Sequence, residues 1–427
     1  MEDIETMQSV VTDHKRFPAL YHRNFTLLWI GLIVSNAGTW MQNVAQGWLV
    51  LQLTNSPLWL GLLGLSFAVP MIVLPLLGGA IADHFNRIKL LYITQTGSML
   101  TAFALALLTW FGVVNVWHIL IASFISSALL AFDNPTRQSL IPNLVPPRDL
   151  LNALSLNSAT YNGAALVGPA LAGALLGPLG AGTLFFLNGV SFLSVIFALA
   201  AMKDVSTHSG GTHTSMREAM WVGLGYAWRN RLILALLVLS ALTAIFGRSY
   251  QNFLPVFARD IWHGGPEAYG LLLSAAGGGA LVGAFGLASI KQVKNQGFLM
   301  VINGLLFSIS IVAFAISPTL ILGIILLFIA GVTTTIFGTI IATFIQTATP
   351  NELRGRVMSL YAITLIGLPS LGALGSGASA EMLGGIDGAP RAILIGAIIL
   401  TVVLIIIAPF FWRREIVHQA EKRSART

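Results

Sequence analysis

Residues 297–346 have the sequence GFLMVINGLLFSISIVAFAISPTLILGIILLFIAGVTTTIFGTIIATFIQ, in which no side chain is charged. A helix needs roughly 20 apolar residues to cross the hydrocarbon core of a bilayer. The stretch is interrupted at Ser317 and Pro318, and each part is about long enough for one crossing. It therefore predicts two consecutive transmembrane helices joined by a short loop.

The rest of the chain has the same character. Apolar residues make up 56% and charged residues 9% of its 427 positions, whereas an average soluble domain has roughly 25% charged residues. Clusters of polar, Pro and Gly residues divide the chain into apolar runs. We therefore predict an all-α membrane protein with twelve transmembrane helices, near residues 26–53, 58–82, 88–111, 116–140, 150–177, 181–202, 232–256, 266–289, 297–317, 319–346, 354–383 and 390–411.

The distribution of basic residues predicts the orientation. Lys and Arg in short loops are retained on the cytoplasmic side of the membrane. With an even number of helices and both termini inside, all of the 23 Lys and Arg residues except Arg248, Arg259 and Arg391 fall in cytoplasmic segments. The first 25 residues are polar, and the apolar run that follows is too long for a signal-peptide core of roughly 7–15 residues. We expect the first helix to be an anchor.

Two pairs of segments repeat at a shift of about half the chain length. SPLWLGLLGLS at 56–66 is similar to GPEAYGLLLS at 265–274, and VPPRDLLNALSL at 145–156 is similar to TPNELRGRVMSL at 349–360. Transporters built from parallel repeats bind substrate between their halves, near the bilayer midplane. We expect two parallel six-helix bundles and the following division: a cytoplasmic N-terminal segment at 1–25, bundles at 26–202 and 232–411, a cytoplasmic linker at 203–231 and a cytoplasmic tail at 412–427.

The expected linker contains SMREAMWVGLGYAWRN at 215–230. An amphipathic helix on the cytoplasmic membrane surface buries its apolar face in lipid and holds basic residues near lipid phosphates. A plain connector between the bundles is the alternative. The apolar residues that fall at helical spacing are Met216, Met220, Trp221, Leu224 and Trp228.

The loop after the second helix reads GGAIADHFNRIKLL, at 78–91. Gly79, Asp83, Arg87 and Lys89 resemble the G-x-L-A-D-R-x-G-R-x signature of the major facilitator superfamily, although His84 and Asn86 depart from that pattern. A glycine at this place lets two helices approach closely. In the family this loop latches the two halves in the outward-facing state, which the resemblance implies for Asp83 and Arg87. The alternative is a loop that only determines topology.

The fourth helix ends in AFDNPTRQSLIP, at 131–142. Asp133 and Arg137 are four residues apart and therefore share a helix face. A carboxylate at the edge of the membrane is costly and usually has a partner or a task. Three interpretations compete: a local pair with Arg137, a gate contact with Arg87, and a carboxylate that takes up a proton during transport. Asp133 is the best single coupling candidate in the first half.

The fifth helix contains YNGAALVGPALAGALLG, at 161–177. Gly168, Pro169 and Gly173 resemble the G-P-x-x-G-G core of the superfamily's antiporter signature, with Ala172 in place of the first closing glycine. Small residues permit close helix packing, and proline removes a backbone hydrogen bond and bends the helix. The resemblance implies export rather than import, and a neutral packing role is the alternative.

Other polar side chains lie within apolar runs, where their cost in lipid argues that they face a cavity or another helix. Arg248 carries the most weight, because an intramembrane cation can bind an anionic or catechol-like substrate. Its alternative is an ion pair with Glu381 or Asp260. For the other polar residues the alternative is hydrogen bonding between helices. The predicted substrate-facing residues are Asn36, Gln42, Gln46, Tyr161, Arg248 and Gln251.

Several chemistries are not supported by any motif. The chain has no cysteine, which excludes disulfides and Cys-ligated metal sites. It has no P-loop, H-E-x-x-H or G-x-S-x-G motif. We expect no enzymatic activity, no cofactor and no metal site. The net charge of +7 is explained by membrane topology, so we expect no nucleic-acid partner.

The resemblance covers nearly the whole chain. Residues 23–54 and 133–173 are similar to the bacterial siderophore and multidrug exporter branch of the major facilitator superfamily, the branch related to the enterobactin exporter. It implies a monomeric secondary transporter of the bacterial inner membrane. The leading hypothesis is a proton-driven exporter of a small amphipathic siderophore, metabolite or drug that works by alternating access. The alternatives are a nutrient symporter or uniporter, a lysophospholipid flippase-like transporter and a membrane scaffold.

Overall fold

The structure is a computed structural model that describes residues 17–82, 86–203, 216–290 and 295–424. Among these residues every regular element is helical. A short 3-10 helix, η1 (Pro18–Tyr21), precedes the first long helix. The long helices of the N-terminal half are α2 (Arg23–Thr54), α3 (Pro57–Ala82), α4 (Arg87–Trp110), α5 (Val116–Leu140) and α6 (Leu150–Ala201).

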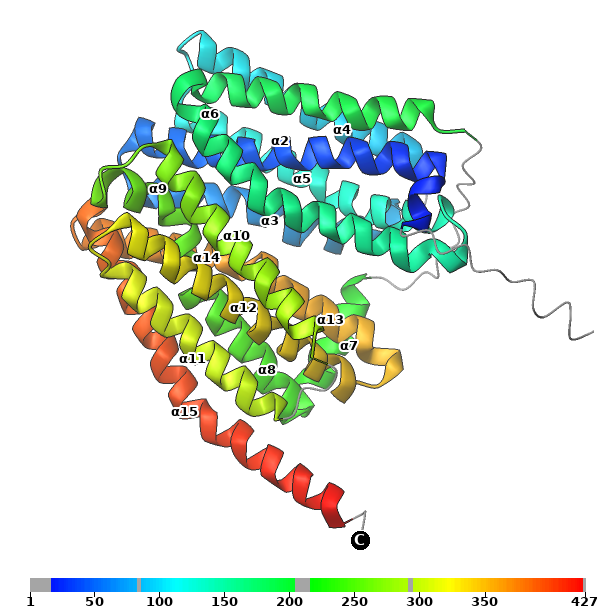
Figure 1. Cartoon of the computed structure of the whole chain (residues 1–427), viewed down its shortest axis with the longest axis vertical. Helices are drawn as coiled ribbons and strands as arrows, with labels where there is room; N and C mark the ends of the chain where they lie inside the picture. The colour runs from blue at the N-terminus through cyan, green and yellow to red at the C-terminus, as the bar shows by residue number, and fades with distance from the viewer. Residues whose placement is uncertain (1–16, 83–85, 204–215, 291–294, 425–427) are drawn as a thin grey trace, which may run out of the picture.

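Helix α6 is two membrane crossings in one continuous stretch. Its 52 residues would extend about 78 Å as a straight helix, more than twice the hydrocarbon thickness of roughly 30 Å. Gly180 interrupts it with φ 75° and ψ 165°, a backbone conformation that side-chain-bearing residues rarely adopt. The chain therefore reverses near Gly180, and the two arms of α6 can be followed in Figure 1.

The C-terminal half contains two interrupted crossings. Its elements are α8 (Arg231–Leu242), α9 (Leu254–Val256), α10 (Pro266–Ala288), α11 (Gln296–Ala315), α12 (Leu320–Ala348), α13 (Asn351–Ile366), α14 (Leu368–Met382) and α15 (Ala389–Ser424). The crossing that starts with α8 continues through π-helical turns at Thr243–Gly247 and Phe257–Ile261 and a 3-10 helix at Ser249–Phe253. Another crossing divides at Gly367 into α13 and α14, where Pro369 in the first turn of α14 cannot donate a backbone hydrogen bond.

The described residues account for the twelve predicted crossings. Ten helical stretches are long and apolar enough to cross a membrane, and the one that contains α6 crosses twice. Helix α2 is not among the ten, because polar residues such as Gln42 and Gln46 lower its hydropathy. Counting α2 completes the set, so the predicted fold class is confirmed. The last helix, α15, continues to Ser424, beyond the expected membrane end at 411.

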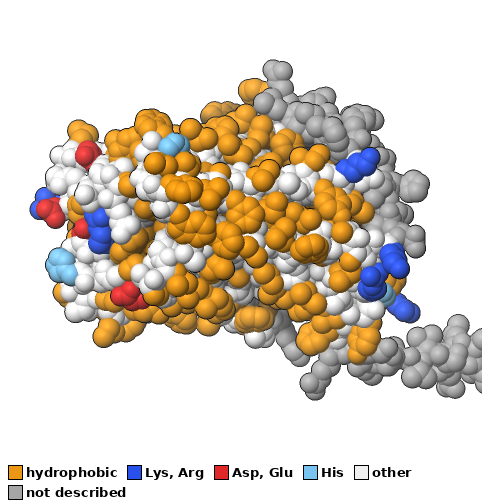
Figure 2. Space-filling view, turned by 90° about the horizontal axis from the view of Figure 1, so that it is seen from above, with side chains coloured by type: hydrophobic (Ala, Val, Ile, Leu, Met, Phe, Trp, Pro, Cys, Tyr) orange, Lys and Arg blue, Asp and Glu red, His pale blue; other side chains and the backbone are white. Residues whose placement is uncertain are grey.

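The surface supports a membrane location. Figure 2 shows hydrophobic side chains over the middle of one face and charged side chains toward its two ends. Large apolar residues such as Trp110, Phe197 and Ile406 are more than half exposed. A soluble monomer rarely exposes so much contiguous apolar surface, whereas lipid covers it at no cost.

The helices form two bundles, the N-bundle (α2 to α6) and the C-bundle (α8 to α15), which meet at one end and diverge toward the other (Figure 1). We call the meeting end, where α2 ends and α3 begins, the closed end. There a Cβ at Gly61 would lie 2.7 Å from the carbonyl oxygen of Ala373, and one at Gly377 would lie 2.9 Å from that of Pro57. Small residues thus bring α3 and α14 into backbone contact across the two halves.

One face of α6 shows where the bundles separate. Near the closed end, Ala165, Pro169 and Gly173 contact α10. Earlier in the helix, Leu154 and Tyr161 lie on the same face at helical spacing, yet they are 40% and 59% exposed. The bundles have therefore moved apart at this second end, the open end, and this face of α6 lines the space between them.

Candidate functional site

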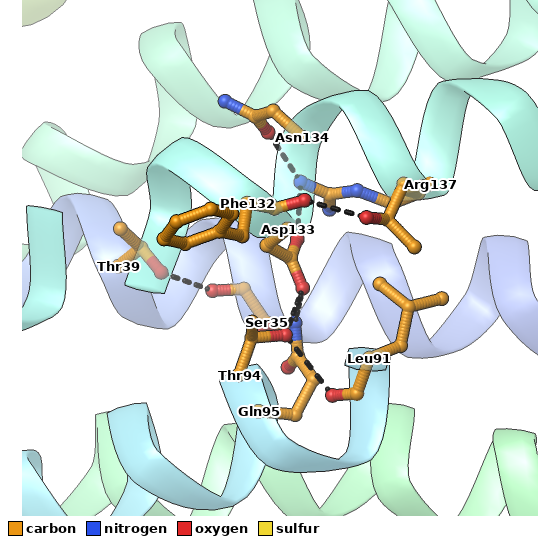
Figure 3. A network of polar contacts seen from close by, with 10 residues as sticks. Ser35, Thr39, Leu91, Thr94, Gln95, Phe132, Asp133, Asn134 and Arg137 are labelled. Atoms are coloured by element: carbon orange, nitrogen blue, oxygen red, sulfur yellow. Dashed lines mark hydrogen bonds and ion pairs between the residues drawn. The ribbon is translucent and has the colours of Figure 1, made fainter. Parts of the chain in front are cut away.

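Asp133 lies at the centre of a buried polar network in the N-bundle. Its side chain is on α5, and the residue is 3% exposed. Oδ1 accepts hydrogen bonds from Thr94 Oγ1 at 2.9 Å and from Gln95 Nε2 at 2.8 Å, both on α4. Oδ2 lies 2.9 Å from Nη2 of Arg137, one turn further along α5. Figure 3 shows the carboxylate between these donors.

The network compensates the cost of a buried charge. An ionised carboxylate removed from water is tolerated where charged and hydrogen-bonding donors surround it. Arg137 also donates to Asn134 Oδ1 at 2.6 Å, and its side chain is 14% exposed, so the network reaches the surface through the guanidinium. Within the described residues Gln95 Oε1 is a buried acceptor without a hydrogen-bond partner. The site therefore holds one unused acceptor beside the carboxylate.

The structure describes only some of the loop residues that were predicted to latch the two halves. Arg87 Nη1 donates to the carbonyl oxygen of Ser139 at 3.2 Å, which ties the start of α4 to the end of α5 within the N-bundle. Asn86 caps α4 by accepting from two backbone amides. Gly79 lies in α3 near its end, and Asp83 lies outside the described residues. Of the three interpretations of Asp133, the structure therefore has the local pair with Arg137 and no contact with Arg87.

The small residues of α6 that resemble the antiporter signature lie on two faces of this helix, and each face packs against another helix. A Cβ at Gly168 would lie 2.5 Å from that of Trp40 on α2. A Cβ at Gly173 would lie 2.9 Å from the carbonyl oxygen of Pro266 on α10. A Cβ at Gly270 of α10 would collide with the carbonyl oxygen of Pro169. The small residues thus join α6 to its own bundle and to the opposite bundle.

The predicted substrate-facing residues of the N-bundle have different surroundings. Gln42 is buried and accepts a hydrogen bond from Asn188 Nδ2 at 2.8 Å, which links α2 to the second arm of α6. Gln46 is 5% exposed, and its Nε2 has no hydrogen-bond partner among the described residues. Asn36 is half-buried. Tyr161 is 59% exposed on the face of α6 that lines the space between the bundles.

Arg248 and Gln251 lie in the interrupted crossing of the C-bundle and are half-buried. The carboxylates expected as alternative partners of Arg248 are engaged elsewhere. Asp260 accepts from Arg259 at 2.9 Å, and Glu381 accepts from Ser56 Oγ at 2.8 Å. Within the described part of the chain no ion pair or side-chain hydrogen bond of Arg248 is found.

Sequence reasoning missed a group of polar contacts that joins the bundles at the closed end. Arg259 donates from Nη1 to the carbonyl oxygen of Leu51 at 3.2 Å and from Nη2 to Asn55 Oδ1 at 2.9 Å. Together with the bond between Ser56 and Glu381, these contacts form what we call the closed-end clasp. Its signal in the sequence was weak: Arg259 is one of the few basic residues outside the expected cytoplasmic segments, and an acidic residue follows it.

Two six-helix bundles that meet at one end, with a buried ion pair inside the N-bundle, are the arrangement expected of a membrane transporter. Residues 15–424 match the profile of the family described as transmembrane secretion effector. The chain therefore belongs to this family of membrane transporters, as the loop and helix-five resemblances predicted.

The relatives include a siderophore transporter and multidrug efflux pumps. The chain is 24% identical over 352 residues to the staphyloferrin A transporter of Staphylococcus aureus. The alignment covers 81% of this chain and 87% of that protein. It is 24% identical over 388 residues to the multidrug efflux pump Tap of Mycolicibacterium fortuitum. This alignment covers 88% of the chain and 92% of the pump. The predicted similarity to siderophore and multidrug transporters is confirmed.

Solved structures share the fold. The chain is similar to a bacterial homologue of the human lysosomal transporter Spinster, with a TM-score of 0.70, 16% identity and coverage of 92% of this chain and 97% of that one. It is similar to the nucleoside transporter NupG, with a TM-score of 0.71, 16% identity and coverage of 91% and 99%. At these identities the likeness concerns the fold alone.

Proposed function

We propose that this transporter is a proton-driven exporter of a small amphipathic molecule and works by alternating access in the inner membrane of a bacterium. The relatives named above include a siderophore transporter and a multidrug efflux pump, and this supports export. The observation that carries proton coupling is the buried carboxylate of Asp133, held by Arg137, Thr94 and Gln95.

The network around Asp133 can serve two protonation states. With the carboxylate ionised, Gln95 Nε2 donates to Oδ1. When Asp133 is protonated, its O–H needs an acceptor, and the unused Oε1 of Gln95 supplies one after the amide rotates by half a turn. Protonation also neutralises the partner of Arg137, which weakens the attraction within α5. The proton thus changes the contacts between α4 and α5, and such a change can bias the bundles toward one orientation.

The orientation in the membrane follows from the charge distribution. We propose that the open end, where α2 begins and α15 ends, is cytoplasmic, so that both termini are cytoplasmic and the closed end faces outward. The structure then represents a state in which the space between the bundles is reached from the cytoplasm. An exporter loads its cargo in this state. A single chain contains both bundles, so we propose that the monomer is the working unit.

The linker helix α7 (Met216–Arg229) supports this orientation. Trp221, Leu224 and Trp228 are exposed along one face, at 60%, 40% and 73%. On its opposite face, Gly223 packs on the backbone of Arg356 in α13. Exposed indole rings beside a basic residue are typical of a helix at the membrane interface. We propose that α7 lies on the cytoplasmic surface and braces the C-bundle.

The function is tested in everted membrane vesicles. The cargo is first chosen as the compound, from a panel of siderophores and antibiotics, that most raises the unfolding temperature of the purified protein. We expect its uptake into vesicles to require an interior-acid pH gradient and to stop when a protonophore removes that gradient. Uptake that is indifferent to the gradient would rule out proton coupling, and uptake into right-side-out vesicles alone would rule out export.

A further inference from the structure

Arg248 lies where the first crossing of the C-bundle is irregular. A π-helical turn ends at Gly247, and a 3-10 helix begins at Ser249. The backbone amide of Arg248 donates to the carbonyl oxygen of Thr243 at 3.1 Å. Interrupted helices near the midplane are where transporters of this type build binding sites, because irregular backbone is tolerated only beside a cavity or inside protein.

The neighbours of Arg248 in the sequence point into the C-bundle. A Cβ at Gly247 would meet Phe307 of α11 and Leu400 of α15. Ser249 accepts a hydrogen bond from Ser376 Oγ of α14 at 3.2 Å. Tyr250 is fully buried, with its ring 6.1 Å from that of Phe314. These side chains fill the C-bundle and leave another face of the segment for Arg248.

One side of this segment meets the N-bundle. Asn252 lies against Gly64 of α3, where an added Cβ would be 3.2 Å from the amide oxygen. Residues three apart lie above one another in a 3-10 helix, so Ser249 and Asn252 share the side that meets α14 and α3, and Tyr250 and Phe253 share a buried side. Arg248 and Gln251 share the third side, which is half-buried and lies next to the side that meets the N-bundle.

An unpaired guanidinium inside a membrane protein is costly. The described acidic residues of the membrane region cannot compensate this one, because Asp133, Asp260 and Glu381 are bound by Arg137, Arg259 and Ser56 respectively. The planar fork of a guanidinium matches a carboxylate or another oxyanion in a two-point contact. Arg248 thus has the chemistry and the half-buried position of an anion-binding group, and it forms no ion pair with the described residues.

We propose that Arg248 is the anion-binding residue of the cargo site, and that the cargo of this transporter is an amphipathic molecule with a carboxylate or similar oxyanion group. The proposal rests on the proposed transport function and names its substrate class. Tyr161, exposed on the facing side of α6, provides an aromatic surface for the apolar part of the cargo.

The test measures binding to the purified full-length protein by its thermal unfolding and its tryptophan fluorescence. The anionic probes are 2,3-dihydroxybenzoate, citrate and lysophosphatidylglycerol, and the cationic probes are ethidium and tetraphenylphosphonium. We expect at least one anion to bind and neither cation to bind more tightly. Loss of a charge-assisted contact in Arg248→Gln should weaken anion binding roughly 10- to 100-fold. Arg391→Gln is the matched control, because Arg391 is exposed and, among the residues that the structure describes, donates to the carbonyl oxygen of Leu383 in its own bundle.

Each outcome decides the proposal. Binding of citrate or dihydroxybenzoate identifies a soluble acid, and binding of lysophosphatidylglycerol alone identifies an anionic lipid as the source of the group. The proposal is overturned if no anion binds, if the cations bind more tightly, or if Arg248→Gln binds anions as tightly as the unmodified protein. If Arg248→Gln does not purify folded, Arg248→Lys decides, since it keeps the charge but loses the two-point contact and should bind anions severalfold more weakly.

The experiment needs no pH gradient. A failure of proton coupling in vesicles would therefore leave the anion site standing. Conversely, a failure of anion binding would leave proton-driven transport of another cargo class possible and would remove only the assignment of Arg248.

Discussion

The carboxylate of Asp133 is one partner of an ion pair with Arg137, and it also accepts two hydrogen bonds from α4. A structural pair and a proton carrier respond differently to removal of charge. If the ion pair is only structural, removing one charge lowers the stability of the protein and its transport activity, and removing both charges restores them. If Asp133 carries the proton, no second change restores coupling.

The substitution Asp133→Asn tests the role of this residue. The amide keeps the shape but leaves Arg137 without its counter-charge, so we expect unfolding to become easier by about 1–3 kcal/mol. Gradient-driven uptake should fall to the level of vesicles without the protein, while cargo binding persists. Thermal unfolding and vesicle uptake measure the two effects. Asp387→Asn, at an exposed acid of the closed end, should change neither, and undiminished gradient-driven uptake by Asp133→Asn would contradict proton carrying.

A second change at the same site separates stability from coupling. We expect Asp133→Asn combined with Arg137→Gln to unfold at nearly the temperature of the unmodified protein, because no unpaired charge remains buried. Uptake should stay uncoupled from the pH gradient. Recovery of gradient-driven uptake in this double variant would show that the pair is structural and that another group carries the proton.

At the scale of elements, the closed end is held by backbone packing and by the closed-end clasp. In α10, Gly270 touches α6 so closely that a Cβ would collide with the backbone of Pro169 and lie 2.9 Å from Cα of Gly173. Both neighbours are main-chain atoms, which cannot move aside as a flexible side chain can. In the proposed alternating-access mechanism these same contacts must open, so their strength would set the balance between the two orientations.

Substitution of a glycine on α10 tests the packing. We expect Gly270→Val to lower the free energy of unfolding by about 1–3 kcal/mol, as an overpacked contact does, and to favour opening at the closed end. Gly286→Val on the same helix is the control, since a Cβ there meets nothing within 4 Å. Thermal unfolding compares the two variants, and equal unfolding temperatures would contradict the predicted role of Gly270.

The clasp is tested by a change at Arg259. Arg259→Gln loses the contacts with Leu51 and Asn55 of the N-bundle, so the population open at the closed end should rise. Because the chain has no native cysteine, spin labels can be placed at Val113 and Asp387, exposed positions of the two bundles at this end. We expect a longer-distance population in their pulsed spin-resonance distribution. Arg391→Gln should leave the distribution unchanged, and an unchanged distribution in Arg259→Gln would show that the clasp does not hold this end.

At the scale of the whole molecule, the arrangement of charge and apolar surface predicts one orientation. The absence of cysteine allows single introduced cysteines to report it. We expect Val113→Cys, at the closed end, to react with a membrane-impermeant maleimide in spheroplasts. Arg148→Cys, whose native side chain is 85% exposed at the open end, should react only in everted vesicles. The reverse pattern would place the termini outside the cytoplasm.

Much of the architecture was predictable from the sequence because it depends on local properties. Roughly 20 apolar residues make one crossing whatever their order, so the twelve runs and the reversal near Gly180 were visible in composition and in turn residues. The spacing of Asp133 and Arg137 placed both on one helix face, and the structure has their ion pair. The glycines of helix five marked a close approach without naming its partner.

The remaining features depend on which helices meet, and no local pattern encodes that. Thr94 and Gln95 reach Asp133, Arg259 reaches Asn55, and Gln42 turns to Asn188 because bundles bring distant residues together after the helices have formed. The sequence by itself determined the membrane class, the twelve crossings and the charge asymmetry, since lipid selects these segment by segment. Only the tertiary structure decided which polar groups are satisfied and that Arg248 is left without a partner among the described residues, because hydrogen bonds between helices depend on packing in three dimensions.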